Sequence, residues 1–130
     1  ALFYLVAQFL GAGVAMLVAN ALTLGGVLNI MLLRRVDYST GTGLAELFGT
    51  MILAFGVASV IYGRASKDLS GVVIGTSLFF GIFFASVISN GVLNPAVALG
   101  IGSFNLAYIL GPIAGGILCM LLFKFLSNEE

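Results

Sequence analysis

Histidine and tryptophan are absent from this 130-residue sequence, cysteine occurs once, and charged residues make up only 8 % of it. Without histidine the chain lacks the commonest general base and the commonest metal ligand. The single cysteine, Cys119, can build neither a disulfide framework nor a multi-cysteine metal site within one chain. Five Lys and Arg residues balance five Asp and Glu residues, so no basic field attracts nucleic acid. These deficits argue against an enzyme, a cofactor or metal site, and a nucleic-acid partner.

Hydrophobic residues make up 61 % of the chain and fall into long runs separated by clusters of charge. A soluble domain is about a quarter charged, so a lipid bilayer is the expected surrounding of this chain. A helix needs about 20 apolar residues to cross about 30 Å of hydrocarbon. The sequence therefore predicts an all-α membrane protein, in one partial domain over residues 1–130, with spans at about 1–24, 44–63, 71–89 and 106–126.

The charges between the spans predict an orientation. Four spans place both chain ends on the side of the short loop that holds Arg64 and Lys67. That side also carries Lys124, against Arg34 and Arg35 in the opposite connector. Since cytoplasmic loops carry an excess of Lys and Arg, we expect a multi-pass protein of the plasma membrane or another cell membrane with cytoplasmic chain ends.

An internal similarity predicts a duplicated architecture. Residues 4–17 align without a gap with residues 108–121, so that Tyr, Gly, Met and Leu coincide. Many membrane transport proteins consist of two related halves, although chance coincidence between apolar runs is the alternative. A true duplication would place counterparts of residues 44–107 about 60 residues upstream of Ala1. The sequence would then be the C-terminal two-thirds of a longer protein.

A short apolar stretch between the third and fourth spans predicts a re-entrant half-helix at about residues 94–102. The stretch is too short to cross a bilayer and too apolar for a solvated loop. Asn94 is a preferred N-cap, and Pro95 suits the first helical turn. Non-helical backbone at membrane depth must be buried in protein or face a water-filled cavity. We therefore expect residues 90–93 to line a cavity.

The polar groups at this turn suit a neutral solute. The Asn94 amide can donate a hydrogen bond, and the carbonyls of Asn90, Gly91 and Val92 can accept one. The positive end of a half-helix disfavours cations and protons. For the tripeptide Asn94-Pro-Ala96 alone, an ordinary turn or helix start is the alternative, but its position between two spans favours a pore.

Glu46 is the one carboxylate among the apolar residues of the second span. An ionisable group there should face the protein interior and be paired or hydrogen-bonded. It could carry protons, or it could accept hydrogen bonds from the free N–H groups of a re-entrant loop. Since no histidine, second carboxylate or buried lysine is available for a relay, the structural role is favoured.

With these residues in view, the chain resembles the major intrinsic protein family, the aquaporins and aquaglyceroporins. The matching pieces are Glu46-Leu-Phe-Gly49-Thr50, Asn94-Pro95-Ala96, Tyr4…Gln8…Gly11-Ala12 and Tyr108…Gly111-Pro112…Gly115. The resemblance implies an aquaporin-like right-handed helix bundle of six spans and two half-helices, assembled as a homotetramer with one pore per subunit. This chain would supply spans three to six and the second half-helix. Aquaporins are an established example of proton exclusion by half-helix dipoles.

The resemblance also implies a selectivity constriction, located by spacing from Asn94. Ile82 stands where the family's water channels have His and its glycerol channels Gly, and Gly91 lies three residues before Asn94. Val97 stands where an Arg is expected. Loss of that Arg removes a fixed positive charge and a fork of hydrogen-bond donors. The apolar ring suggests either a wider pore for small uncharged solutes or a constriction that conducts poorly.

The leading hypothesis from the sequence is a passive channel for water or small neutral solutes such as glycerol. The first alternative is a non-conducting membrane-structural or adhesion protein on the same scaffold. The second is a coupled secondary transporter, which needs an ion- or proton-binding cluster that Glu46 alone does not make.

Overall fold

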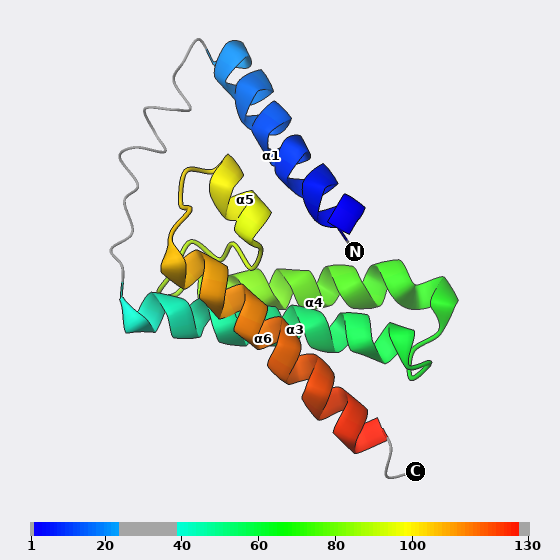
Figure 1. Ribbon diagram of the computed structural model, residues 1–130. Coiled ribbons are helices and arrows are strands. Elements are labelled where there is room, and N and C mark those ends of the chain that lie inside the picture. The colour runs from blue at the N-terminus through cyan, green and yellow to red at the C-terminus, as the bar shows by residue number, and fades with distance from the viewer. Residues whose placement is uncertain (1, 24–38, 128–130) are drawn as a thin grey trace.

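The computed structural model describes residues 2–23 and 39–127, and within these ranges every regular element is a helix. Along the chain they are α1 (Leu2–Leu22), α3 (Thr40–Ile61), the 3-10 helix η1 (Lys67–Leu69), α4 (Ser70–Ala85), α5 (Pro95–Gly100) and α6 (Leu106–Ser127) (Figure 1). Helices α1, α3 and α6, and α4 together with η1, are long and apolar enough to cross a membrane. The predicted all-α membrane fold is confirmed.

The helices begin and end a few residues away from the predicted positions. Helix α3 starts at Thr40 because Ser39 caps it, its Oγ accepting a hydrogen bond of 3.0 Å from the Thr42 N–H. Helix α4 ends at Ala85, and the chain then turns towards Ser89, whose Oγ lies 2.9 Å from the Ala85 carbonyl oxygen. Most of the predicted connector, residues 24–38 with Arg34 and Arg35, lies outside the described residues.

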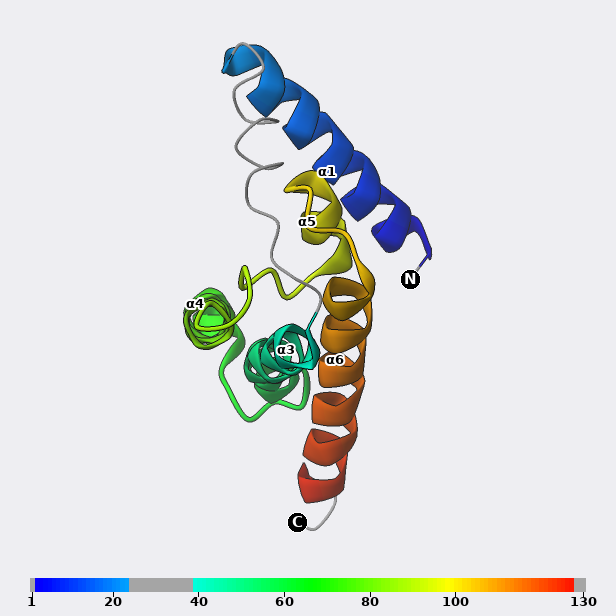
Figure 2. The ribbon, with the colours of Figure 1, turned by 90° about the vertical axis from the view of Figure 1, so that its left-hand side faces the viewer.

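Helix α3 is the central element, with α4 packed on one side and α6 on the other (Figure 2). Glycines allow both approaches. A Cβ added at Gly49 would lie 2.7 Å from the Gly81 carbonyl oxygen of α4. On the other side, a Cβ added at Gly115 of α6 would overlap the Leu47 carbonyl of α3. Small residues let helix backbones come close in lipid, where van der Waals packing drives association.

Helix α1 lies apart from this three-helix group and contacts the rest of the chain mainly through α5 (Figures 1 and 2). Gly100 of α5 faces Ala12, and the rings of Phe9 and Phe104 meet edge to face with centroids 6.3 Å apart. No residue of α1 is buried, although its span has a mean hydropathy of 2.0. Its remaining apolar faces therefore need a cover of lipid or of further protein.

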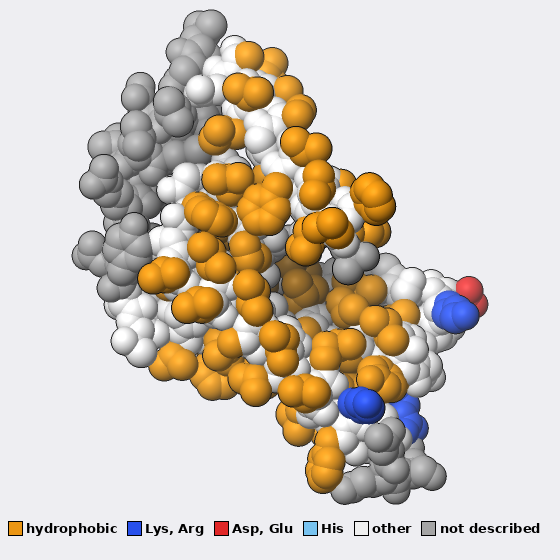
Figure 3. Space-filling view, in the orientation of Figure 1, with side chains coloured by type: hydrophobic (Ala, Val, Ile, Leu, Met, Phe, Trp, Pro, Cys, Tyr) orange, Lys and Arg blue, Asp and Glu red, His pale blue; other side chains and the backbone are white. Residues whose placement is uncertain are grey.

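Charge and apolar surface are separated on the molecule. Apolar side chains are spread over the described part of the face shown in Figure 3, and the blue side chains gather near the α3–α4 loop and the end of α6. The described basic residues are Arg64, Lys67 and Lys124. A broad apolar band with basic residues at one end is the distribution of an integral membrane protein.

The contact between α3 and α6 predicts that Gly115→Ala is destabilising. The added methyl group would meet Leu47 backbone atoms, which cannot rotate away, so α6 must shift outward. We expect a loss of about 1–3 kcal/mol, the usual range for overpacking, measured as a lower melting temperature in detergent. Gly116→Ala is the matched control, since an added Cβ there meets nothing within 4 Å. Equal melting temperatures for the two variants would contradict this account of the packing.

Candidate functional site

The segment between α4 and α6 leaves the bundle and returns on the same side. The Asn90 N–H donates to the Tyr108 hydroxyl at 2.9 Å, and the Asn90 Nδ2 donates to the Ser103 Oγ at 2.8 Å. Residue 90 lies just before the short helix α5, whereas residues 103 and 108 follow it. These two hydrogen bonds therefore close the segment into a loop with its two ends together.

The tip of the loop reaches back alongside α3 and α4. The Leu93 side chain lies against Gly81, four residues inside the end of α4, and the Leu93 N–H donates to Glu46, six residues inside the start of α3. At about 1.5 Å per residue, these positions lie about 6–9 Å below the helix ends. The chain thus enters the depth of the spans and turns back, as a re-entrant segment does.

The Glu46 carboxylate holds this loop. It is completely buried, and three groups donate to it: the Ser89 hydroxyl at 2.7 Å and the Val92 N–H at 2.9 Å to Oε1, and the Leu93 N–H at 2.6 Å to Oε2. The Ser89 Oγ in turn accepts from the Gly91 N–H at 2.9 Å. Consecutive backbone donors that no helix satisfies thus reach one carboxylate directly or through one serine. This is the arrangement of a structural acceptor.

The half-helix is shorter than predicted. It runs from Pro95 to Gly100, with Asn94 as the N-cap whose Oδ1 accepts from the Ala96 N–H at 2.9 Å. The predicted range extended to residue 102, but Gly102 has φ +73°, a left-handed conformation that ends the helix. The cap orients the Asn94 amide, since an oxygen fixed on the α5 backbone directs the NH2 group away from it.

That NH2 group points to α1. The Asn94 Nδ2 donates to the Gln8 Oε1 at 3.3 Å, and both residues line a groove of about 490 Å³ between α1 and α5. Val97 lines the same groove and is 45 % exposed. An amide nitrogen carries two N–H donors, so one of them remains for another acceptor.

The residues of the expected constriction lie in two places. Gly91 packs on Ile82, because a Cβ added at Gly91 would lie 2.9 Å from the Ile82 carbonyl oxygen and 3.3 Å from its Cγ2. Gly91 also has φ +59°, which favours glycine. Val97 lies beyond the turn, in the groove towards α1. The predicted carbonyl acceptors of the pore belong to residues that are buried, Gly91 and Val92, or half-buried, Asn90.

Several residues of the site were missed at the sequence level. Ser89 and Ser103 flank the apolar stretch, and polar residues at its two ends were the available signal. Gln8, Thr50 and Tyr108 enter the sequence analysis only as parts of the family resemblance. Thr50, whose Oγ1 donates to the Leu93 carbonyl at 3.4 Å, follows Glu46 by one helical turn and so shares its face.

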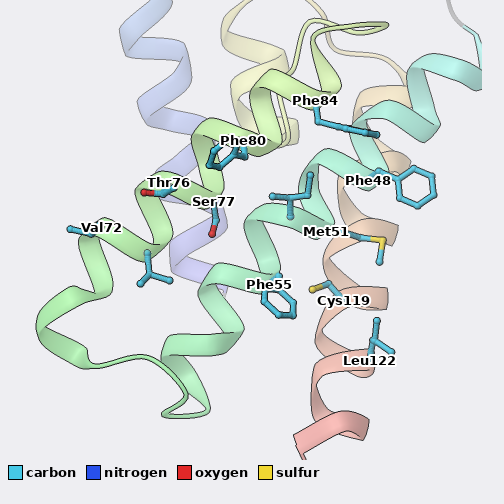
Figure 4. A pocket seen from close by; sticks show the side chains of 12 residues that line it. Phe48, Met51, Phe55, Val72, Thr76, Ser77, Phe80, Phe84, Cys119 and Leu122 are labelled. Carbon is cyan, nitrogen blue, oxygen red and sulfur yellow. The ribbon is translucent and has the colours of Figure 1, made fainter.

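A groove larger than the one between α1 and α5 lies elsewhere and contains none of the predicted site residues. It has a volume of about 720 Å³, is formed by α3, α4 and α6, and is almost entirely apolar (Figure 4). Phe48, Phe55, Phe80 and Phe84 line it. Because this lining is apolar, the large volume of the groove does not indicate a site for polar chemistry. Within the described ranges, no group of three or more His, Cys, Asp and Glu side chains could hold a metal ion.

Four membrane helices with a re-entrant half-helix before the last one define a polytopic membrane protein of the channel and transporter type. The chain belongs to the major intrinsic protein family, whose family model matches residues 1–123. Proteins of this family are channels, not enzymes. The predicted family membership is confirmed, whereas the assignment to spans three to six stays a prediction.

Curated relatives come from archaea, bacteria and animals. The chain is 28 % identical to Aquaporin AqpM of Methanothermobacter marburgensis, over 97 % of the chain and 58 % of the relative. It is 30 % identical to Aquaporin-6 of Mus musculus, over 97 % and 46 %. It is also 30 % identical to Glycerol uptake facilitator protein-like 6 of Lactiplantibacillus plantarum, over 100 % and 66 %. The chain thus spans about half the length of the curated relatives it matches. No solved structure matches it significantly.

The hydrogen bonds of Glu46 predict that Glu46→Gln loosens the re-entrant loop. An amide replaces one acceptor oxygen by an NH2 group, which would face the donors of Ser89 and Val92 or that of Leu93. We expect a loss of about 1–3 kcal/mol and faster hydrogen–deuterium exchange in peptides covering residues 90–94. Thr50→Val is the control, because it removes one long hydrogen bond and should have a smaller effect. Wild-type exchange in the Glu46→Gln variant would refute the role assigned to the carboxylate.

Proposed function

We propose that the full-length protein is a passive membrane channel for water and small uncharged solutes such as glycerol. The observation that carries the proposal is the oriented Asn94 amide at the tip of a re-entrant loop. Its oxygen is bound by the Ala96 N–H, so its nitrogen faces the groove beside α1. A fixed donor at that depth can replace one of the hydrogen bonds that a neutral solute leaves behind in water.

The surroundings of Glu46 favour a passive channel over a proton-coupled transporter. Its two oxygens already accept three hydrogen bonds, two of them from backbone groups that have no freedom to turn away. Protonation of the carboxylate would convert one acceptor into a donor facing these groups. Glu46 is therefore suited to hold the loop in one conformation and unsuited to a cycle of proton uptake and release.

We assign the selectivity constriction to Ile82, Gly91 and Val97, and the pore-lining backbone carbonyls to Asn90, Gly91 and Val92. In support, Ile82 and Gly91 are in contact, and Ile82 and Val97 are 39 % and 45 % exposed, so neither side chain is taken up by the core of this chain. With valine in place of arginine, the three proposed positions are apolar or lack a side chain, and none is charged. Such a constriction would suit uncharged solutes better than a strict water filter.

Assembly and orientation are further parts of the proposal. Large apolar side chains remain exposed along α3 and α4, among them Phe48, Phe55, Phe79 and Phe83. We assign these faces to contacts within a homotetramer in a cell membrane, with the chain ends cytoplasmic, as the basic residues Lys67 and Lys124 at one end suggest. Light scattering of the purified protein measures the number of subunits.

Osmotic shrinkage of proteoliposomes tests the channel. Vesicles containing the full-length protein should shrink faster than empty vesicles in an impermeant osmolyte, and should re-swell faster when glycerol or urea is the osmolyte. Stopped-flow light scattering measures both rates. Rates equal to those of empty vesicles for water, glycerol and urea alike would end the proposal and favour a non-conducting structural protein on the same scaffold.

The absence of arginine at the constriction predicts the effect of Val97→Arg. An arginine there adds a charge and fills space, so glycerol permeability should fall by about tenfold relative to water permeability, since one steric mismatch costs a bound solute about 1–3 kcal/mol. The matched control is Val87→Arg, at a residue that is 79 % exposed beyond the end of α4. An unchanged ratio of glycerol to water permeability in Val97→Arg would remove Val97 from the constriction.

A further inference from the structure

We propose that Leu93 is the positioning residue of this site. Its side chain packs between α3 and α4 where these helices cross, so the packing of the two helices sets the direction of the Asn94 amide. The inference rests on the proposed channel for its transport readout. Its structural content, that one apolar side chain fixes the turn, can be tested without transport.

The backbone of Leu93 is in a conformation that is unfavourable for a leucine. Its φ is +57°, and among the described residues it is the one non-glycine residue with a positive φ. Such a conformation crowds the Cβ of an L-residue and persists only where surrounding contacts determine it. The contacts that hold Leu93 must therefore outweigh this cost, which is what a positioning role requires.

The side chain supplies the first of these contacts. Leu93 is 4 % exposed and forms a core cluster with Ala45 and Ala85. Its Cδ2 would lie 2.6 Å from a Cβ at Gly49, and its Cδ1 2.9 Å from a Cβ at Gly81. The two glycines that allow α3 and α4 to cross closely thus also form the socket for the leucine. A change in that crossing would displace Leu93.

The backbone groups of Leu93 supply the other contacts that hold this residue. The Leu93 N–H donates to the Glu46 Oε2 at 2.6 Å, and its carbonyl accepts from the Thr50 Oγ1 at 3.4 Å, so both peptide groups are tied to one face of α3. The next residue, Asn94, is extended, with φ −154° and ψ 122°, and begins α5. Between the fixed Leu93 carbonyl and the helix cap, Asn94 has little freedom to turn its amide.

Leu93→Ala in the full-length protein tests the inference. Removing the side chain leaves the socket empty, so exchange in peptides covering residues 90–96 should rise at least threefold. The ratio of glycerol to water permeability should change by at least twofold, because a loosened amide no longer presents one geometry. A merely structural role would lower both permeabilities together with the amount of folded protein and leave their ratio unchanged. Leu99→Ala, the same change at a residue of α5 that is 39 % exposed, should alter neither quantity.

Two further variants keep the test decisive. Leu93→Met keeps an apolar side chain of similar volume without a branch at Cβ and should show wild-type exchange and a wild-type permeability ratio. Leu93→Ile keeps the volume of the side chain but adds a branch at Cβ, which disfavours a positive φ. It should therefore show the raised exchange and the changed permeability ratio expected of Leu93→Ala, and it replaces that variant if Leu93→Ala does not fold. Wild-type exchange and ratio in Leu93→Ile, or in a folded Leu93→Ala, would overturn the inference. A wild-type protein that conducts nothing while exchange changes as expected would overturn the channel and leave the positioning role standing.

Discussion

The buried carboxylate of Glu46 is the constraint from which the rest of the site follows. A backbone that leaves helical geometry inside a membrane exposes N–H groups that lipid cannot satisfy, and each unsatisfied group costs several kcal/mol. Glu46 satisfies two of them directly, and through Ser89 it supports the N–H of Gly91. A single side chain of α3 thereby makes a non-helical turn tolerable at a depth where only helices are normally stable.

The close crossing of α3 and α4 serves two purposes at once. Without a Cβ at Gly49 and Gly81, the helix backbones come near enough to pack in lipid, where burial from water provides no driving force between helices. The same missing atoms leave the space that Leu93 fills. Helix association and loop position are therefore not independent, and a residue that widened the crossing would also displace the turn. The α3–α6 contact, with Gly115 on the Leu47 backbone, fixes the third helix in the same way.

The sequence was sufficient for the parts of the fold that depend on length and local chemistry. Span number follows from the thickness of the hydrocarbon layer, and the half-helix start follows from Asn94 and Pro95, because capping is a property of neighbouring residues. The backbone conformation of Leu93 could not be predicted, because leucine avoids a positive φ and only contacts from α3 and α4 impose one. The Asn94–Gln8 hydrogen bond joins residues 86 positions apart, and no local sequence pattern predicts a contact over that separation.

The shortness of α5 bears on how the proposed pore would reject ions. With six residues, α5 aligns few peptide dipoles, so its contribution to cation exclusion is smaller than that of a full half-helix. In the proposed constriction Val97 carries no charge, which would leave desolvation as the principal barrier. An ion passing Ile82 and Val97 would lose hydration that no nearby charge replaces, at a cost of many kcal/mol, whereas a neutral solute gives up only hydrogen bonds, of which Asn94 can restore one. An apolar constriction beside one fixed amide can therefore discriminate against charge without carrying any charge of its own.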